Sequence, residues 1–262
     1  MGTLSFNTSG PNSYGWRLGN QMFQYASLFG IAKKNEMSPC FNISRTYLDK
    51  CFKLGGVEDK VVTDLDGEIH DPSMEYNGNF FKLKNNLNIN LNGYFQIPEY
   101  FNHCRNDIKI EFTFVKDIMS KACTQLPEGV LVSVHVRRAD YLNIPEHHTN
   151  LQVEYYERAM KNFEGYSPVI FSDDIEWCKK NLNHLADVVY FSEHPPDDGN
   201  DGVYVDLCKM SLCNGHIIAN SSFSWWGAYL GEGRTVAPKK WFGPKGPQEY
   251  QDIYLEDWIL HD

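Results

Sequence analysis

The chain has 262 residues, and its 24 Lys and Arg against 34 Asp and Glu give a formal net charge of −10 at pH 7. Hydrophobic residues make up 42% of the chain and charged residues 22%, a composition that excludes an intrinsically disordered protein. The negative charge argues against a general nucleic-acid binder, which needs a basic face. Any phosphate group that this protein binds must therefore be held by a few local cations.

No stretch approaches the roughly 18 uninterrupted apolar residues of a membrane-spanning helix, and the polar residues 1–14 do not resemble a signal peptide. We therefore expect no stable membrane insertion and a cytoplasmic location, which suits a bacterial or viral protein. The seven cysteines are odd in number and lack CxxC spacing, so we expect reduced, buried thiols.

The first half of the chain has a weakly regular pattern. A glycine-bounded turn at residues 15–19 leads into a helix whose apolar residues, from Met22 to Ala32, share one face. Residues 55–79 are rich in Gly, Asp and Asn and predict an exposed excursion, and residues 87–91 alternate as a half-buried strand does. The best candidate for a domain boundary is at residues 126–129, just before the regular second half. We therefore expect two lobes with a cleft between them.

The second half alternates strand and helix patterns, beginning with a β-branched apolar run at residues 129–136. We predict helices at 152–163, 175–182, 203–213 and 222–230, and further strands at 169–171, 188–191 and 216–219. This rhythm indicates a parallel sheet flanked by helices, which binds ligands beyond the carboxyl ends of its strands.

The strongest local motif is His-Val-Arg-Arg-Ala-Asp-Tyr at residues 135–141, at the end of the first buried strand. Guanidinium groups make bidentate contacts with phosphate oxygens, so two of them at this edge indicate an anion site. Because neighbouring strand residues point to opposite faces, one arginine can face the ligand while the other pairs with Asp140. The alternative is an Arg–Asp pair that only closes the strand.

Two further strands end in polar clusters of the same kind. Phe-Ser-Asp-Asp at residues 171–174 offers carboxylates that can read the N1–H and amine of guanine, or can cap the following helix. Residues 220–230 place Ser221 and Ser222 at a helix start, where hydroxyl and backbone N–H groups can hold phosphate or simply cap the helix.

Metal chemistry has little support in the sequence, and we expect no metal site. Asp64 and Asp66 have the DxD spacing of metal-dependent sugar transferases, but they lie in the acidic excursion. Residues 198–202 depart from a calcium loop at Gly202, and His147 and His148 lack partners at ligand spacing.

A fourth motif, Arg-Leu-Gly-Asn-Gln-Met-Phe-Gln-Tyr-Ala at residues 17–26, completes an ordered set with the three described above. Together these motifs resemble the α-1,2-fucosyltransferase family, a glycosyltransferase family 11-like group of GT-B fucosyltransferases. The resemblance implies an α/β fold of two Rossmann-like lobes facing a cleft. It also implies metal-independent, inverting transfer from GDP-fucose to the 2-hydroxyl of a galactose in an oligosaccharide acceptor, with no other cofactor.

On this resemblance, residues 1–126 form the N-terminal, acceptor-side lobe and residues 127–242 the GDP-fucose-binding lobe. Residues 243–262 are expected to pack back on the first lobe. The resemblance implies the following contacts with the donor: Arg138 or Arg137 with the β-phosphate, His135 with the nucleotide, Asp174 with or without Asp173 with guanine, Ser221 and Ser222 with the diphosphate or ribose, and Arg17 and Asn20 with the sugar and pyrophosphate.

A departing diphosphate needs fixed positive charge, so we expect Arg138→Ala to lower kcat by at least about 10²-fold. Asp140 and Glu146 are the candidate general bases, ahead of His147 and His148.

Two alternatives to this fucosyltransferase stay open. One is a metal-dependent transferase that uses Asp64 and Asp66, and the other is a non-catalytic glycan-binding protein on the same fold. The linkage of the product is a further open point.

Overall fold

In a computed structural model, the structure describes residues 1–7, 17–194 and 201–262. The chain divides into two compact units, Met1–Val115 with Glu249–Leu255, and Lys116–Gln248 with Glu256–Asp262. We describe each unit by itself. Within the described residues, no helix combines the length and the apolar character needed to cross a membrane.

The first unit is built on a parallel five-stranded sheet in the order β3-β2-β1-β5-β4. The strands are β1 (Thr3–Phe6), β2 (Ser38–Phe41), β3 (Glu58–Asp59), β4 (Gly67–Asp71) and β5 (Ile89–Gly93). The helices are α1 (Leu18–Lys34), α2 (Leu48–Cys51) and α3 (Arg105–Glu111), with 3-10 turns η2 (Ile43–Arg45), η3 (Gly78–Lys82), η4 (Pro98–Tyr100), η5 (Asn102–Cys104) and η7 (Gln251–Ile253). Helix α1 is buried over most of its length, which agrees with the predicted apolar helix.

The predicted exposed excursion at residues 55–79 is only partly correct. Its side chains are mostly exposed, but β3 and β4 lie within it and add edge strands to the sheet. Strand β4 has little apolar alternation, and its hydrogen bonding comes from its parallel partner β5. The sequence of residues 67–71 therefore has no alternation of apolar and polar residues that would indicate a strand.

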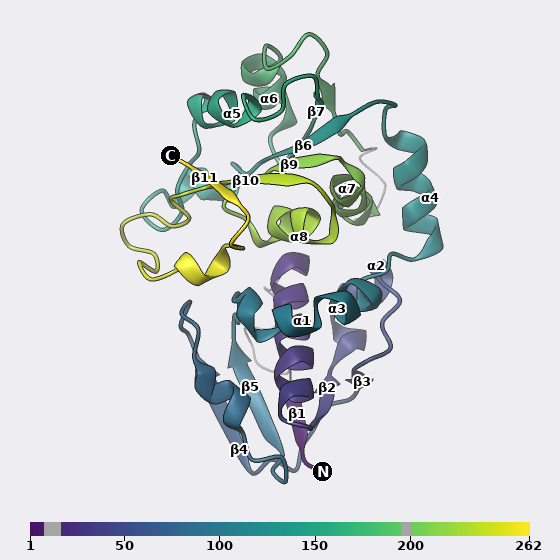
Figure 1. The fold of residues 1–262 in the computed structure, drawn as a ribbon, viewed down its shortest axis with the longest axis vertical. Helices are drawn as coiled ribbons and strands as arrows, with labels where there is room; N and C mark the ends of the chain where they lie inside the picture. The colour runs from purple at the N-terminus through teal and green to yellow at the C-terminus, as the bar shows by residue number, and fades with distance from the viewer. Residues whose placement is uncertain (8–16, 195–200) are drawn as a thin grey trace. The chain divides into compact units, whose positions relative to one another are not determined.

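The second unit is built on a parallel six-stranded sheet in the order β11-β10-β9-β6-β7-β8 (Figure 1). Its strands are β6 (Leu131–Val136), β7 (Ser167–Ser172), β8 (Tyr190–Phe191), β9 (Gly215–Ile217), β10 (Arg234–Pro238) and β11 (Ile259–His261). Its helices are α4 (Lys116–Gln125), α5 (Val153–Met160), α6 (Ile175–Leu182), α7 (Asp201–Leu212) and α8 (Ser222–Leu230), with the 3-10 turn η6 (Asp140–Asn143). The predicted alternation of strand and helix in this half is confirmed.

The division between the units precedes α4, whereas the sequence suggested a boundary after residue 126. Helix α4 groups with the second unit because it packs on α7, where Lys121 pairs with Asp201 at 3.1 Å. Of the C-terminal residues, Glu249–Leu255 group with the first unit, while Glu256–Asp262 add β11 to the second.

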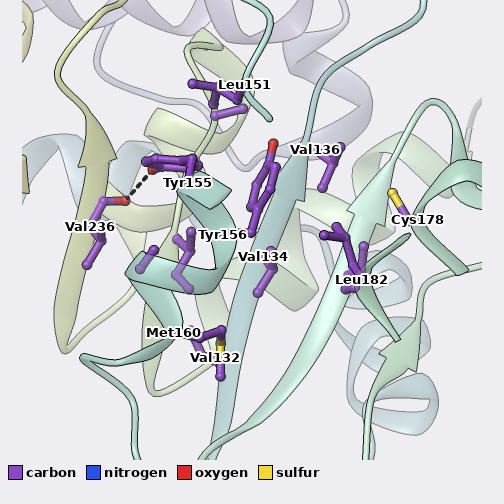
Figure 2. Packing of buried hydrophobic residues seen from close by; sticks show 14 of the residues in the cluster. Val132, Val134, Val136, Leu151, Tyr155, Tyr156, Met160, Cys178, Leu182 and Val236 are labelled. Atoms are coloured by element: carbon purple, nitrogen blue, oxygen red, sulfur yellow. Dashed lines mark hydrogen bonds between the residues drawn. The ribbon is translucent and has the colours of Figure 1, made fainter. Parts of the chain in front are cut away.

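The two faces of the second sheet have different cores. Val132, Val134 and Val136 of β6 pack with side chains of α5 and α6, as Figure 2 shows for Tyr156 and Leu182. Leu131, which directly precedes Val132, packs with Met210 and Cys213 on the α7 side. Because strand residues alternate between faces, even-numbered residues of β6 face α5 and α6, and odd-numbered residues face α7 and α8. All seven cysteines are free thiols, and Cys123 is the exposed one.

Candidate active site

The strand order of the second sheet defines where a ligand can bind. From β6 the chain adds β7 and β8 on one side, then returns to add β9, β10 and β11 on the other. The strand order therefore reverses between β6 and β9, and parallel sheets bind ligands beyond the carboxyl ends at such a point. Residues 137–141 follow β6 and residues 218–222 follow β9, so two of the predicted motifs meet at this edge.

Arg137 pairs with two carboxylates, one from its own loop and one from the loop after β7. Its Nη1 is 2.7 Å from Asp173 Oδ2 and its Nη2 is 2.5 Å from Asp140 Oδ1. The guanidinium carbon lies 5.3 Å from the centre of the Tyr141 ring, and the Tyr141 hydroxyl donates a hydrogen bond of 3.1 Å to the carbonyl of Asn220, after β9. The predicted pairing of one arginine with Asp140 is thus present, and it belongs to Arg137.

Arg138 turns toward α6 instead. Its Nε donates to Asp174 Oδ2 at 3.1 Å, and its guanidinium carbon lies 3.9 Å from the centre of the Trp177 ring. The backbone N–H groups of Arg138 and Ala139 both donate to Asp173 Oδ1, at 2.9 and 3.3 Å. Among the described residues, no side chain or carbonyl hydrogen-bonds to the terminal nitrogens of Arg138.

Asp173 and Asp174 are both engaged by the arginine motif. Asp174 is also the N-cap of α6, because its Oδ1 accepts a hydrogen bond from the N–H of Trp177 at 3.3 Å. The capping alternative is therefore realised at Asp174. Recognition of guanine by these carboxylates stays a prediction. Each carboxylate would have to accept hydrogen bonds from the base while it keeps its contacts with the arginine motif.

His135 is buried on the α8 side of the sheet, with its ring 5.8 Å from that of Phe223. Burial lowers the pKa of this imidazole to about 4, although Asp173 and Asp206 act in the opposite direction. The ring is therefore neutral at physiological pH. Its Nδ1 is buried, and no described residue hydrogen-bonds to it.

A buried polar cluster near the end of β8 was missed by the sequence analysis. Asp206 Oδ1 accepts hydrogen bonds from the Ser192 hydroxyl at 2.5 Å and pairs with His194 Nε2 at 2.8 Å. Lys209 Nζ donates to Ser192 Oγ at 2.8 Å and lies 3.7 Å from Asp206. Burial lowers the pKa of the Lys209 ammonium, which Asp206 partly offsets. The signal in the sequence was the pair of opposite charges at Asp206 and Lys209, three residues apart and flanked by mostly apolar residues of α7.

The serines occupy the predicted helix start. Ser221 is the N-cap of α8 and its side chain makes no capping hydrogen bond, so ordinary side-chain capping does not explain it. Ser222 is the first residue of the helix. Trp225 and Trp226 are fully buried, as expected for core residues.

In the first unit, Arg17 is the N-cap of α1, while Gly15 and Trp16 of the same loop lie outside the described residues. Asn20 Oδ1 accepts a hydrogen bond of 2.7 Å from the Nε2 of Gln96, a residue that the sequence analysis did not select. Two further side chains of α1 hold the same segment, since Gln24 donates to the Gly93 carbonyl and Ser27 to the Phe95 carbonyl, each at 3.0 Å. The segment after β5 is thus fixed along one face of α1.

The candidate bases have different surroundings. Asp140 is paired with Arg137, so its carboxylate also orients the guanidinium. Glu146 is exposed and pairs with Lys245 at 2.6 Å. The ring of Tyr141, next to Asp140 in the chain, stacks on the ring of His148 with 4.0 Å between their centres.

The DxD pair lies at the opposite end of the first sheet from its carboxyl edge. Asp66 directly precedes β4, and its Oδ2 accepts a hydrogen bond from the N–H of Asn88 at the start of β5. No cluster of three or more His, Cys, Asp or Glu side chains suited to a metal ion occurs among the described residues.

Two Rossmann-like units, each built on a parallel sheet, are the architecture of the GT-B fold. Solved structures agree on the fold. The NodZ α-1,6-fucosyltransferase of Bradyrhizobium, soaked with GDP-fucose, superposes with a TM-score of 0.57 at 11% identity, covering 87% of this chain and 92% of that one.

The sequence comparisons specify the family. The model of Glycosyl transferase family 11 matches residues 8–262, and the chain belongs to this family. An α-1,2-colitosyltransferase of Escherichia coli is 30% identical, over 92% of this chain and 95% of that protein. Galactoside α-(1,2)-fucosyltransferase 1 of Bos taurus is 28% identical, over 84% of this chain and 66% of that protein. The predicted family and fold are confirmed, and the chain is a glycosyltransferase.

Proposed function

We propose that this glycosyltransferase moves L-fucose from GDP-β-L-fucose to the 2-hydroxyl of a galactose residue in a glycan acceptor, with inversion and without a metal ion. The relatives named α-1,2-fucosyltransferases support the reaction type, and the fold neighbour soaked with GDP-fucose supports the donor. The observation that carries the proposal is the arginine motif beside the start of α8, at the switch point of a family 11 chain.

Arg137 is the better candidate for the diphosphate ligand. It continues the face of β6 on which His135 meets α8, and it contacts Tyr141, whose hydroxyl reaches the loop after β9. Arg138 lies against Trp177 of α6, on the other face. The sequence alone admitted either residue and placed Arg138 first. The geometry favours Arg137 as the ligand and Arg138 as support for the loop.

The start of α8 adds to this charge. Helix α8 begins at Ser222, so the positive end of its dipole lies beside Ser221 and Ser222. A leaving diphosphate gains negative charge as the sugar becomes cationic, so fixed positive groups stabilise the transition state more than the ground state. These residues need only bind and orient the diphosphate for the bond to the sugar to weaken.

We infer that the base of the nucleotide lies near His135 and Asp206. Asp206 acts electrostatically on His135, and the Nδ1 of His135 is a buried polar atom without a partner among the described residues. Ser192, His194 and Lys209 all contact Oδ1 of Asp206, which leaves Oδ2 for a ligand donor. Asp173 and Asp174, by contrast, already accept hydrogen bonds from the arginine motif.

The test is release of GDP from GDP-fucose in excess EDTA, with and without lactose or N-acetyllactosamine, followed by NMR of the product linkage. Acceptor-dependent release and an α-1,2 product are expected. Loss of turnover in EDTA that returns with a divalent ion would overturn the metal-independent mechanism. Binding of oligosaccharide without any GDP release, over a panel of acceptors, would favour a glycan-binding protein.

A second donor has a specific observation behind it. The E. coli relative that aligns with 92% of this chain is named a colitosyltransferase, so GDP-colitose belongs in the same assay. Turnover with GDP-colitose and none with GDP-fucose would keep the transferase reaction and replace the sugar.

A further inference from the structure

Arg137 is the first member of a column of four neighbouring groups, which continues through Tyr141 and His148 to Phe242. Its guanidinium carbon lies 5.3 Å from the centre of the Tyr141 ring. The Tyr141 ring lies 4.0 Å from that of His148, with only 6° between the two planes. The His148 ring is in turn 5.9 Å from Phe242. A charged group over an aromatic face, with two more rings behind it, is restricted to a narrow range of positions.

The Tyr141 hydroxyl ties this column to the loop after β9. It donates to the carbonyl of Asn220, and the buried Asn220 side chain donates to the carbonyls of Thr149 at 3.0 Å and Trp241 at 2.7 Å. Tyr141 thereby connects the loops that follow β6, β9 and β10 within one network.

The far end of the column is equally well anchored. Residues His148 and Phe242 form an antiparallel bridge, and the Thr149 hydroxyl donates to the Phe242 carbonyl at 2.9 Å. Lys245 holds Glu146 through both its backbone N–H and its ammonium group. The loop between η6 and α5 is therefore fixed to residues 242–245 along several residues.

We propose that Tyr141 is a positioning residue of the transferase, which fixes the Arg137 guanidinium beside the start of α8 through its ring and its hydrogen bond to Asn220. This inference rests on the proposed function of Arg137. The two carboxylates that pair with Arg137 each hold one of its terminal nitrogens. Tyr141 contacts Arg137 through its ring and the loop after β9 through its hydroxyl. Burial raises the pKa of its phenol to about 12, so the hydroxyl stays a donor throughout the working range.

The test compares Tyr141→Phe, which keeps the ring and loses the hydroxyl, with Tyr141→Leu, which loses both. Because an oriented charge acts in the transition state, kcat should fall while the KM for the donor stays within about threefold. We expect a loss in kcat of about threefold to tenfold for Tyr141→Phe, as for one neutral hydrogen bond. For Tyr141→Leu we expect about 10²-fold, as for misplacement of a catalytic group. Leu142→Ala, an exposed neighbour in the same loop, is the matched control and should retain wild-type kinetics.

Coupling to Arg137 separates positioning from a general structural role. In an Arg137→Lys background, Tyr141→Leu should cause little additional loss in kcat, because the group that it positions is already gone. Losses that simply multiply, or a folded Tyr141→Leu protein with kcat within twofold of wild type, would overturn the proposal.

A measurement without any donor separates this inference from the proposed function. Arginine side-chain ¹⁵N NMR, assigned with Arg137→Lys, should show restricted rotation of the Arg137 guanidinium in the wild type and faster rotation in Tyr141→Leu. Equal rotation in both proteins contradicts the column. An inactive wild-type enzyme with a restricted Arg137 contradicts the choice of donor instead.

Discussion

The two adjacent arginines after β6 have the same chemistry and different surroundings, so their variants should behave differently. Arg137→Ala should lower kcat by at least about 10²-fold, since it removes a preorganised charge from the leaving group. Arg138→Ala, which loses the contacts with Asp174 and Trp177, should cost about tenfold or less through the position of the loop. Steady-state kinetics on both variants, with thermal unfolding as the control for folding, decide between them. A larger loss for Arg138→Ala would restore it as the phosphate ligand.

Two buried histidines predict how stability depends on pH. Burial lowers the pKa of His135 and of His216 to about 4, and His216 is held between the Ser133 hydroxyl at 2.9 Å and the Glu232 carbonyl at 3.0 Å. Between about pH 6.5 and 4 the unfolded chain binds more protons at these sites than the folded chain does. The free energy of unfolding should therefore fall as pH falls through this range, by at most about 1.4 kcal/mol per pH unit for each histidine.

Urea unfolding at a series of pH values measures this slope, and His216→Gln should make it shallower. The exposed His70→Gln is the control for removal of any histidine. A slope that is the same in the wild type and in His216→Gln would mean that His216 does not contribute to it.

At the scale of single elements, the turn after β5 depends on Gly93. Its φ of +151° is rare for residues with side chains, and an added Cβ would lie 2.1 Å from the Asp71 carbonyl oxygen of β4. Gly93→Ala should therefore lower the free energy of unfolding by about 1–3 kcal/mol, measured by chemical denaturation. Gly67→Ala, in the adjacent strand with no atom within 4 Å of the added Cβ, is the control and should cost much less. Equal effects of the two substitutions would show that the turn adjusts without strain.

Elements set by local patterns were predictable from the sequence. Helices α6 and α8 begin and end at the predicted residues, because residue types that favour a helix start, Asp174 and Ser221, directly precede them in the chain. The Arg137–Asp140 pair spans three residues and was also foreseeable. Strand β4 was not predicted, because its structure comes from pairing with β5. The contact of Asn20 with Gln96 joins residues far apart in the chain, and only the fold brings them together.

At the scale of the whole molecule, the C-terminal segment contributes to both compact units. In the first unit, the Asp252 carboxylate accepts a hydrogen bond of 2.7 Å from the N–H of Tyr76. In the second, β11 pairs in parallel with β10, and the Trp258 ring lies 5.5 Å from that of Trp225. Residues 249–255 thus contribute to the first unit and residues 256–262 to the second, whose sheets are otherwise formed by separate stretches of chain.

Two nested deletions test this division of the segment by hydrogen exchange. Removal of residues 256–262 exposes the edge of β10 and opens the aromatic packing around Trp225, so amides of β10 and α8 should lose protection. Amides of the first unit should keep theirs. Removal of residues 249–262 should in addition release the amide of Tyr76, because its acceptor Asp252 is gone. Equal loss in both units after the shorter deletion would contradict this division, and so would unchanged protection of α8.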